Sequence, residues 1–181
     1  MAILVLGGVK SGKSRYAARR AEHARRLSGA PITLVATARA LDEEMTRRIA
    51  RHRDDRPAHW QTLELPDDLP ASTRALSARG HIVVVDCLTL WLTDLLMQGL
   101  DDETIGNCVA QLGRVLEGAE TPVILVSNET SLGIIPPDPL SRRFCDLAGQ
   151  MHQRLAEVCT EVVWVAAGLP LWLKGDEHDH T

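Results

Sequence analysis

Short aliphatic runs alternate with longer amphipathic segments along most of this chain. Runs of this kind are typical of strands buried on both faces of a parallel sheet, and they occupy residues 2–6, 32–37, 81–86, 122–127 and 162–165. The segments between them predict helices that begin near residue 15 and then cover 42–53, 67–79, 88–97, 101–117 and 140–158. Segments 61–65 and 169–173 are weaker strand candidates, the second at a sheet edge because it contains Pro170.

This alternation predicts an α/β fold, with a mostly parallel sheet and helices on both of its faces. Ligands of such sheets bind beyond the carboxyl ends of the strands, so the residues that follow each apolar run are site candidates. They include Thr37, Ala38 and Arg39 after one run, and Asn128 and Glu129 after another. The loop over 130–139 is long enough to act as a functional cover.

Composition limits the partners of the protein. The chain has 181 residues and a net charge of −4, and this length is enough for one domain, expected over 1–174, followed by a polar, frayed tail over 175–181. Its modest charge gives no indication of a nucleic-acid partner, and no apolar segment is long enough to span a membrane. The four cysteines are scattered, as expected for a cytoplasmic protein without a disulfide scaffold.

The most informative segment, Gly7–Ser14, follows the first apolar run and reads G-G-V-K-S-G-K-S. A strand, a G-x-x-x-x-G-K-S loop and a helix together form the context of a nucleotide phosphate-binding loop. Its backbone N–H groups and the helix N-terminus bind phosphate oxygens, Lys13 reaches the β- and γ-phosphates, and Ser14 binds Mg²⁺. A glycine-rich turn without a ligand is the alternative interpretation.

Asp86 ends the apolar run 81–86, which is the Walker-B pattern of a carboxylate that binds Mg²⁺. The alternative is that Asp86 caps the helix expected to begin near Leu88. Switch GTPases carry D-x-x-G and N-K-x-D motifs, but here Asp86 is followed by C-L-T and the later strand by N-E-T-S. A small-molecule phosphotransferase is therefore favoured over a regulatory GTPase.

The helix predicted over 42–53 places Met45, Ile49 and His52 on one face. Arginines are dense around His52, and guanidinium groups match the geometry of phosphate oxygens. The alternative is a packed boundary histidine beside a solvated, charge-balanced helix face. His59 is the other histidine in this region, and its setting in Pro57-Ala58-His59-Trp60 favours a structural role.

Further motifs accompany the phosphate loop in a fixed order along the chain. They are A-T-A at 36–38, D-x-E-M at 42–45, R-I-x-x-H-R-x-x-R-P-x-H-W-x-x-x-E at 48–64, D-C-L-T at 86–89, S-N-E at 127–129, G-I-I-P at 133–136 and R-R-F-x-D-x-x-G at 142–149. Together they resemble the bifunctional adenosylcobinamide kinase / adenosylcobinamide-phosphate guanylyltransferase family. The chain departs from the family pattern at 130–132, which lacks a glycine, and at Cys145 and His152.

The resemblance implies a RecA-like P-loop fold, a homotrimer and two reactions. ATP or GTP would phosphorylate adenosylcobinamide, and GTP would then give its GMP to adenosylcobinamide phosphate through a guanylyl-histidine at His52. It also implies Lys13 and His52 as catalytic residues, and Ser14 and Asp86 as Mg²⁺ ligands. The expected nucleotide-binding residues are Gly7, Gly8, Val9, Lys10, Ser11, Gly12, Lys13, Ser14, Arg15, Thr37, Ala38, Arg39, Arg53, Asp54, Asp55, Arg56, Glu64 and Asp86.

Two other functions stay open at this point. The chain could be a monofunctional P-loop kinase of a small alcohol, in which His52 only packs. It could also be a nucleotide-binding regulatory module that does not turn its ligand over. The first predicts no covalent nucleotide on the protein, and the second predicts binding of GTP without release of pyrophosphate.

Overall fold

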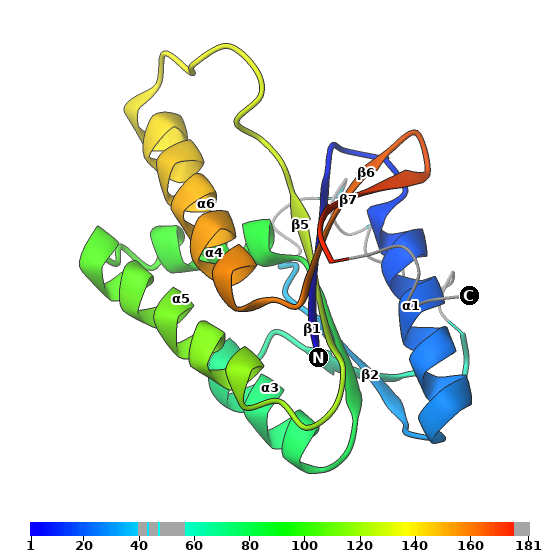
Figure 1. The fold of residues 1–181 in the computed structure, drawn as a ribbon. Helices are drawn as coiled ribbons and strands as arrows, with labels where there is room; N and C mark the ends of the chain where they lie inside the picture. The colour runs from blue at the N-terminus through cyan, green and yellow to red at the C-terminus, as the bar shows by residue number, and fades with distance from the viewer. Residues whose placement is uncertain (40–42, 44–46, 48–56, 176–181) are drawn as a thin grey trace.

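A computed structural model describes residues 1–39, 43, 47 and 57–175 of the chain (Figure 1). The strands within these residues are β1 (Ala2–Gly7), β2 (Ile32–Ala36), β3 (Gln61–Glu64), β4 (Ile82–Asp86), β5 (Val123–Asn128), β6 (Glu161–Ala166) and β7 (Leu169–Lys174). They form one seven-stranded sheet in the order β3-β2-β4-β5-β1-β6-β7. All neighbouring pairs are parallel except β6 and β7, which are antiparallel. The predicted mostly parallel sheet is confirmed, with Pro170 in the edge strand β7.

Helices cover both faces of this sheet, as the alternation of segments predicted. The described helices are α1 (Lys13–Ser28), α3 (Leu69–Ala78), α4 (Leu88–Met97), α5 (Asp102–Glu117) and α6 (Pro139–Val158). Figure 1 shows α1 on one face and the group α3 to α6 on the other. None of the described helices combines the length and apolar character needed to cross a membrane.

The ends of the helices and strands predicted from the sequence differ from those in the structure by only a few residues. Helix α1 begins at Lys13, two residues earlier than expected, because Gly12 in a left-handed conformation (φ 101°) turns the loop directly into the helix. The helix predicted over 42–53 lies outside the described residues, apart from Glu43 and Arg47. The predicted tail lies outside them beyond residue 175.

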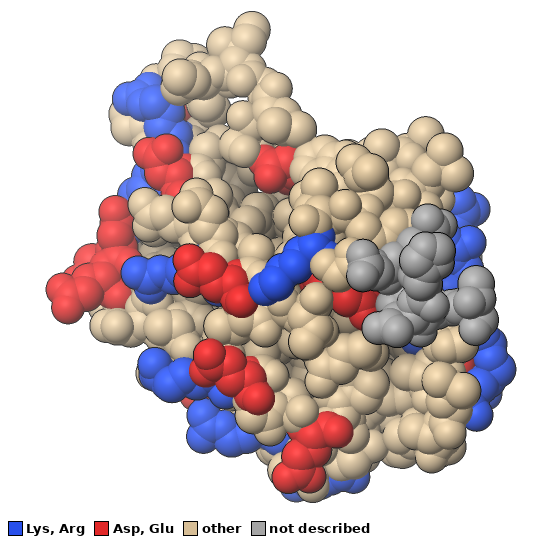
Figure 2. Space-filling view, viewed as in Figure 1, with Lys and Arg blue, Asp and Glu red and all other residues tan. Residues whose placement is uncertain are grey.

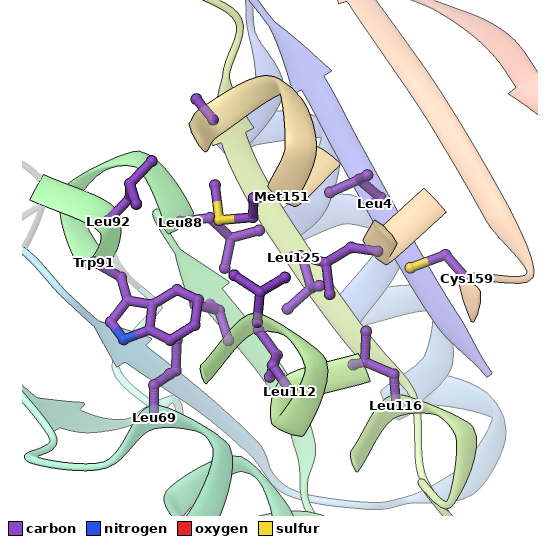
Figure 3. Close-up of a cluster of buried hydrophobic side chains, with 14 of the residues drawn as sticks. Leu4, Leu69, Leu88, Trp91, Leu92, Leu112, Leu116, Leu125, Met151 and Cys159 are labelled. Carbon is purple, nitrogen blue, oxygen red and sulfur yellow. The ribbon is translucent and has the colours of Figure 1, made fainter. Parts of the chain in front are cut away.

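Each central strand contributes side chains to two separate cores. In β1, Leu4 and Leu6 pack on the side of α4, α5 and α6, whereas Ile3 and Val5 pack on the side of α1. Figure 3 shows the larger core, where leucines of β1 and β5 meet Trp91 and Met151 from the helices. Successive residues of a strand point to opposite faces, so burial on both faces requires an uninterrupted aliphatic run.

A buried ion pair joins α1 to β6. The Arg20 guanidinium donates to both carboxylate oxygens of Glu161, at 2.6 and 2.9 Å, and also to the Tyr16 hydroxyl at 3.0 Å. Both charged side chains are less than a tenth exposed. Because α1 carries the first residues after the phosphate loop, this pair helps to fix the helix against the sheet.

Removing one charge of this pair should destabilise the protein strongly. We expect Glu161→Gln to lower the free energy of unfolding by about 3–5 kcal/mol, since it leaves the Arg20 charge buried without its partner. Asp102→Asn is the matched control, because the pair of Asp102 with Arg143 is exposed and should contribute about 1 kcal/mol or less. Urea denaturation measures both values, and equal losses would contradict this account of the pair.

Candidate active site

The phosphate loop connects β1 to α1 in a tightly curled backbone. Gly7 is required there, because a Cβ atom at this position would lie 2.3 Å from the carbonyl oxygen of Val165. Lys10 adopts a positive φ of 55°, and the Ser11 N–H donates to the Gly8 carbonyl at 3.2 Å. The first turn of α1 contains no acidic residue, so the positive end of the helix is left for an external anion.

Lys13 and Ser14 are the first two residues of α1. They join the phosphate loop to the second predicted motif, which ends at Asp86. Lys13 is largely buried, and its Nζ donates to the Gly8 carbonyl at 2.6 Å. The Ser14 hydroxyl donates to Asp86 Oδ2 at 2.9 Å. The pair combines a hydroxyl and a carboxylate oxygen, which are the hard donors that suit Mg²⁺.

Asp86 is not the cap of the helix that follows it. Cys87 occupies the N-cap position of α4 and makes no side-chain capping bond. The Asp86 carboxylate instead faces Ser14 across the end of the sheet. Burial raises the pKa of the neighbouring Cys87 thiol, with a further contribution from the negative charge of Asp86, so this cysteine is a protonated packing group.

The turn between β6 and β7 supports the phosphate loop from the side. Ala167 and Gly168 have positive φ values of 51° and 81°, which is the conformation of a type I′ hairpin turn. The Gly168 N–H donates to the Ser11 carbonyl at 2.8 Å, and a Cβ atom on Gly12 would lie 3.1 Å from Gly168 Cα. This contact is not among the predictions from the sequence, although a two-residue turn that contains glycine between apolar strands is a hairpin signal.

The end of β2 lies at the same rim as the phosphate loop. The Thr37 hydroxyl donates to the Cys87 carbonyl at 2.7 Å and accepts the Cys87 N–H at 2.9 Å, so it fixes the backbone next to Asp86. Arg39, two residues further on, forms an ion pair with Asp94 of α4. Glu64 ends β3 opposite Ala36 and is exposed at this rim.

The remaining predicted site residues lie outside the described part of the chain. They are the predicted nucleophile His52 and the nucleotide-binding candidates Arg53, Asp54, Asp55 and Arg56. The structure thus brings together the phosphate loop, Asp86 and the ends of β2 and β3, and it describes no contact of these five residues.

The competing histidine, His59, is bound to the scaffold. Its Nε2 lies 2.7 Å from Glu22 Oε1 in α1, and the Trp60 indole N–H donates to the same oxygen at 2.6 Å. Burial alone would raise the pKa of Glu22, but hydrogen bonds from Trp60, Arg25 and His59 outweigh it and lower that pKa to about 2. These contacts agree with the structural role expected for His59.

Residues 3–173 match the family described as cobinamide kinase / cobinamide phosphate guanyltransferase. The chain belongs to this family. It is 49% identical over 180 residues to the bifunctional adenosylcobalamin biosynthesis protein CobP of Pseudomonas aeruginosa, covering 96% of this chain and 97% of that protein. Identity to the bifunctional adenosylcobalamin biosynthesis protein CobU of Salmonella typhimurium is 37% over 188 residues, covering 96% and 100%.

A solved structure shares the fold of this cobinamide kinase / guanyltransferase family member. The KaiC-like protein PH0186 from Pyrococcus horikoshii OT3 aligns with a TM-score of 0.58 and 16% identity, covering 99% of this chain and 81% of that chain. A likeness at this identity concerns the fold alone. It agrees with the RecA-like P-loop architecture that the sequence resemblance implied.

The hairpin turn should matter for nucleotide binding and not only for folding. Gly168→Ala puts a Cβ atom at a strained positive φ of 81° in the turn that contacts Ser11, and this atom would lie 2.9 Å from the Arg15 guanidinium, so the flexible Arg15 side chain must move away from the loop. We expect a loss of stability of about 1 kcal/mol and a roughly tenfold weaker affinity for GTP. Gly29→Ala is the matched control, because Gly29 has a similar φ of 73° but nothing within 4 Å of its added Cβ.

Calorimetric titration with GTP and thermal melting of both variants separate the two effects. Gly29→Ala should lose a similar amount of stability and keep its affinity for GTP. Equal affinities in the two variants would show that the turn supports the loop less than its contacts indicate.

Proposed function

We propose that this chain phosphorylates adenosylcobinamide and then transfers GMP from GTP to adenosylcobinamide phosphate. The observation that carries the proposal is the match of residues 3–173 to a family described by both activities. Relatives that align over nearly their whole length bear the name of bifunctional adenosylcobalamin biosynthesis proteins. The first reaction releases a nucleoside diphosphate, and the second releases pyrophosphate and yields adenosylcobinamide-GDP.

In the kinase reaction, the phosphate loop holds the triphosphate of ATP or GTP. Support comes from the curled backbone between Gly7 and Gly12, the uncompensated N-terminus of α1 and the position of Lys13. Ser14 and Asp86 would hold Mg²⁺, because their oxygens lie 2.9 Å apart and are of the type that this ion prefers. When bound there, Mg²⁺ would neutralise negative charge on the phosphate oxygens.

In the guanylyl transfer, a neutral imidazole nitrogen of His52 attacks the α-phosphorus of GTP, and the bond to pyrophosphate breaks. The phosphate of the acceptor then attacks the guanylylated histidine and restores the free imidazole. His52 lies outside the described residues, so its role rests on the resemblance of the block 48–64 to the family. The competing histidine at position 59 is bound to Glu22, which disfavours it as the nucleophile.

The other nucleotide contacts belong to the same proposal. Thr37, Ala38, Arg39 and Glu64 are proposed to line the nucleotide on the rim formed by β2 and β3, and Arg53–Arg56 to contact its phosphates. The homotrimer and the cytoplasmic location stay predictions from the sequence.

Labelled GTP tests the covalent step directly. Protein incubated with GTP labelled at the α-phosphate should retain acid-labile label, and protein incubated with γ-labelled GTP should retain none. His52→Ala should abolish this labelling, because it removes the attacking nitrogen. His59→Ala is the matched control and should still be labelled. Label retained by His52→Ala at the level of the unchanged protein would overturn the assignment of the nucleophile.

The two reactions should respond differently to single substitutions. His52→Ala should lose guanylyl transfer by about 10³-fold or more and keep the phosphorylation of adenosylcobinamide. Lys13→Ala should weaken both reactions by about 10²-fold or more, since both use the phosphate loop. Separate assays with adenosylcobinamide and with its phosphate measure this. A folded His52→Ala variant that lost both activities would contradict the division of roles.

A further inference from the structure

A largely buried polar cluster lies next to the phosphate loop and has been given no role in the steps described above. Ser127 lies near the end of β5, Glu129 directly follows that strand, and His152 lies in α6. The Ser127 hydroxyl lies 2.7 Å from His152 Nε2, and His152 Nδ1 lies 3.6 Å from Glu129 Oε2. The Glu129 Oε1 atom accepts the Ser131 N–H at 2.6 Å and also the Ser131 hydroxyl.

The strand order places the backbone of Glu129 between the phosphate loop and Asp86. Strand β5 lies between β1, which leads into the phosphate loop, and β4, which ends at Asp86. The Glu129 N–H donates to the Gly7 carbonyl at 3.0 Å, so its backbone adjoins the first residue of the loop. On the other side, β5 pairs Val126 with Asp86. Glu129 therefore follows the strand that separates the two phosphate-handling motifs.

The side chains of the cluster hold Glu129 in its charged form. Burial would raise the pKa of Glu129, but hydrogen bonds from Ser131 and the proximity of His152 outweigh it, so the pKa is lowered. Burial lowers the pKa of His152 more strongly than Glu129 raises it, so this imidazole is neutral near pH 7. A carboxylate only accepts hydrogen bonds, so the arrangement favours the tautomer with its proton on Nδ1, toward Glu129, and with Nε2 accepting the Ser127 hydroxyl.

The order serine, histidine and carboxylate is also that of a hydrolytic triad, but Ser127 cannot serve as a nucleophile here. It is fully buried between β5 and α6, so no substrate reaches its hydroxyl. The Glu129 side chain keeps 13% of its surface exposed. The cluster thus contacts the Glu129 carboxylate on its buried side and leaves part of this side chain exposed.

We propose that Glu129 is the catalytic base of the kinase reaction and that His152 is the positioning residue that holds its carboxylate. In this step the proton of the acceptor hydroxyl passes to Glu129 while the hydroxyl oxygen bonds to the γ-phosphorus. The bond from that phosphorus to the β–γ bridging oxygen breaks, the nucleoside diphosphate leaves, and Glu129 later returns the proton to solvent. The assignment rests on the proposed kinase function.

The two proposed reactions differ in their need for such a base. The acceptor in the kinase reaction is an aliphatic hydroxyl, which is protonated near pH 7. The acceptor in the guanylyl transfer is a phosphate monoester, which is already an anion at this pH. Loss of the base should therefore slow the first reaction and spare the second.

Glu129→Gln keeps the shape of the side chain and removes the base. We expect kcat for adenosylcobinamide phosphorylation to fall about 10²-fold or more, with KM for the acceptor and guanylyl transfer each changed less than about threefold. Glu157→Gln is the matched control, because Glu157 is an exposed carboxylate on the same helix as His152. It should change neither reaction.

The positioning role of His152 is tested by His152→Leu, His152→Asn and a double variant. His152→Leu should lower kcat of phosphorylation about tenfold alone, but have no further effect in the Glu129→Gln background, because the base that it positions is already absent. His152→Asn should restore most of the rate, since an amide N–H can take the place of the imidazole N–H that faces Glu129. Retained guanylyl transfer shows that each variant is folded.

Three outcomes would overturn the assignment. Near-normal phosphorylation by Glu129→Gln would show that the base is elsewhere, while the proposed function stands. Loss of both reactions and of GTP binding in that variant, with its fold intact, would make Glu129 a nucleotide-binding residue. If the protein without substitutions bound GTP but did not phosphorylate adenosylcobinamide, the proposed kinase function would be wrong, and the assignment of Glu129 would be wrong with it.

Discussion

The hydrogen bond between Ser14 and Asp86 depends on the parallel pairing of the central strands. Strands β1 and β4 are separated by β5 and run in the same direction, so the loop after one and the last residue of the other arrive at the same edge of the sheet. Two motifs that are 72 residues apart in sequence thereby come within 2.9 Å. The N-terminus of α1, the Thr37 hydroxyl and the backbone N–H of Glu129 are arranged around this meeting point.

The sequence predicted the sheet and its phosphate loop because both have local signatures. Strands buried on both faces must be aliphatic throughout, and β1, β4 and β5 are such runs. The phosphate loop is recognisable from its glycines. One of them, Gly7, is needed because any side chain there would clash with the Val165 carbonyl. The edge strand β7 was recognised from Pro170, but its antiparallel pairing was not predicted.

Contacts between distant segments could not be predicted in the same way. The support of Ser11 by Gly168 and the cluster of Ser127, Glu129 and His152 join segments that are far apart in the chain, and no spacing rule connects them. His152 appeared in the sequence only as a departure from the family pattern. The Arg39–Asp94 pair likewise shows how an arginine expected at a phosphate is also held by a neighbouring helix. The face of the molecule seen in Figure 2 intersperses acidic and basic side chains and so has no single dominant charge.

The hairpin turn at Ala167-Gly168 also affects how the protein is made. The phosphate loop precedes, by most of the sequence given, both the turn that supports it from the side and β6, one of the two strands that flank β1. A nascent chain therefore contains the complete phosphate-loop motif long before the residues that support this loop have been synthesised. The backbone around the motif is thus completed only when the β6–β7 hairpin, far along the chain, has formed.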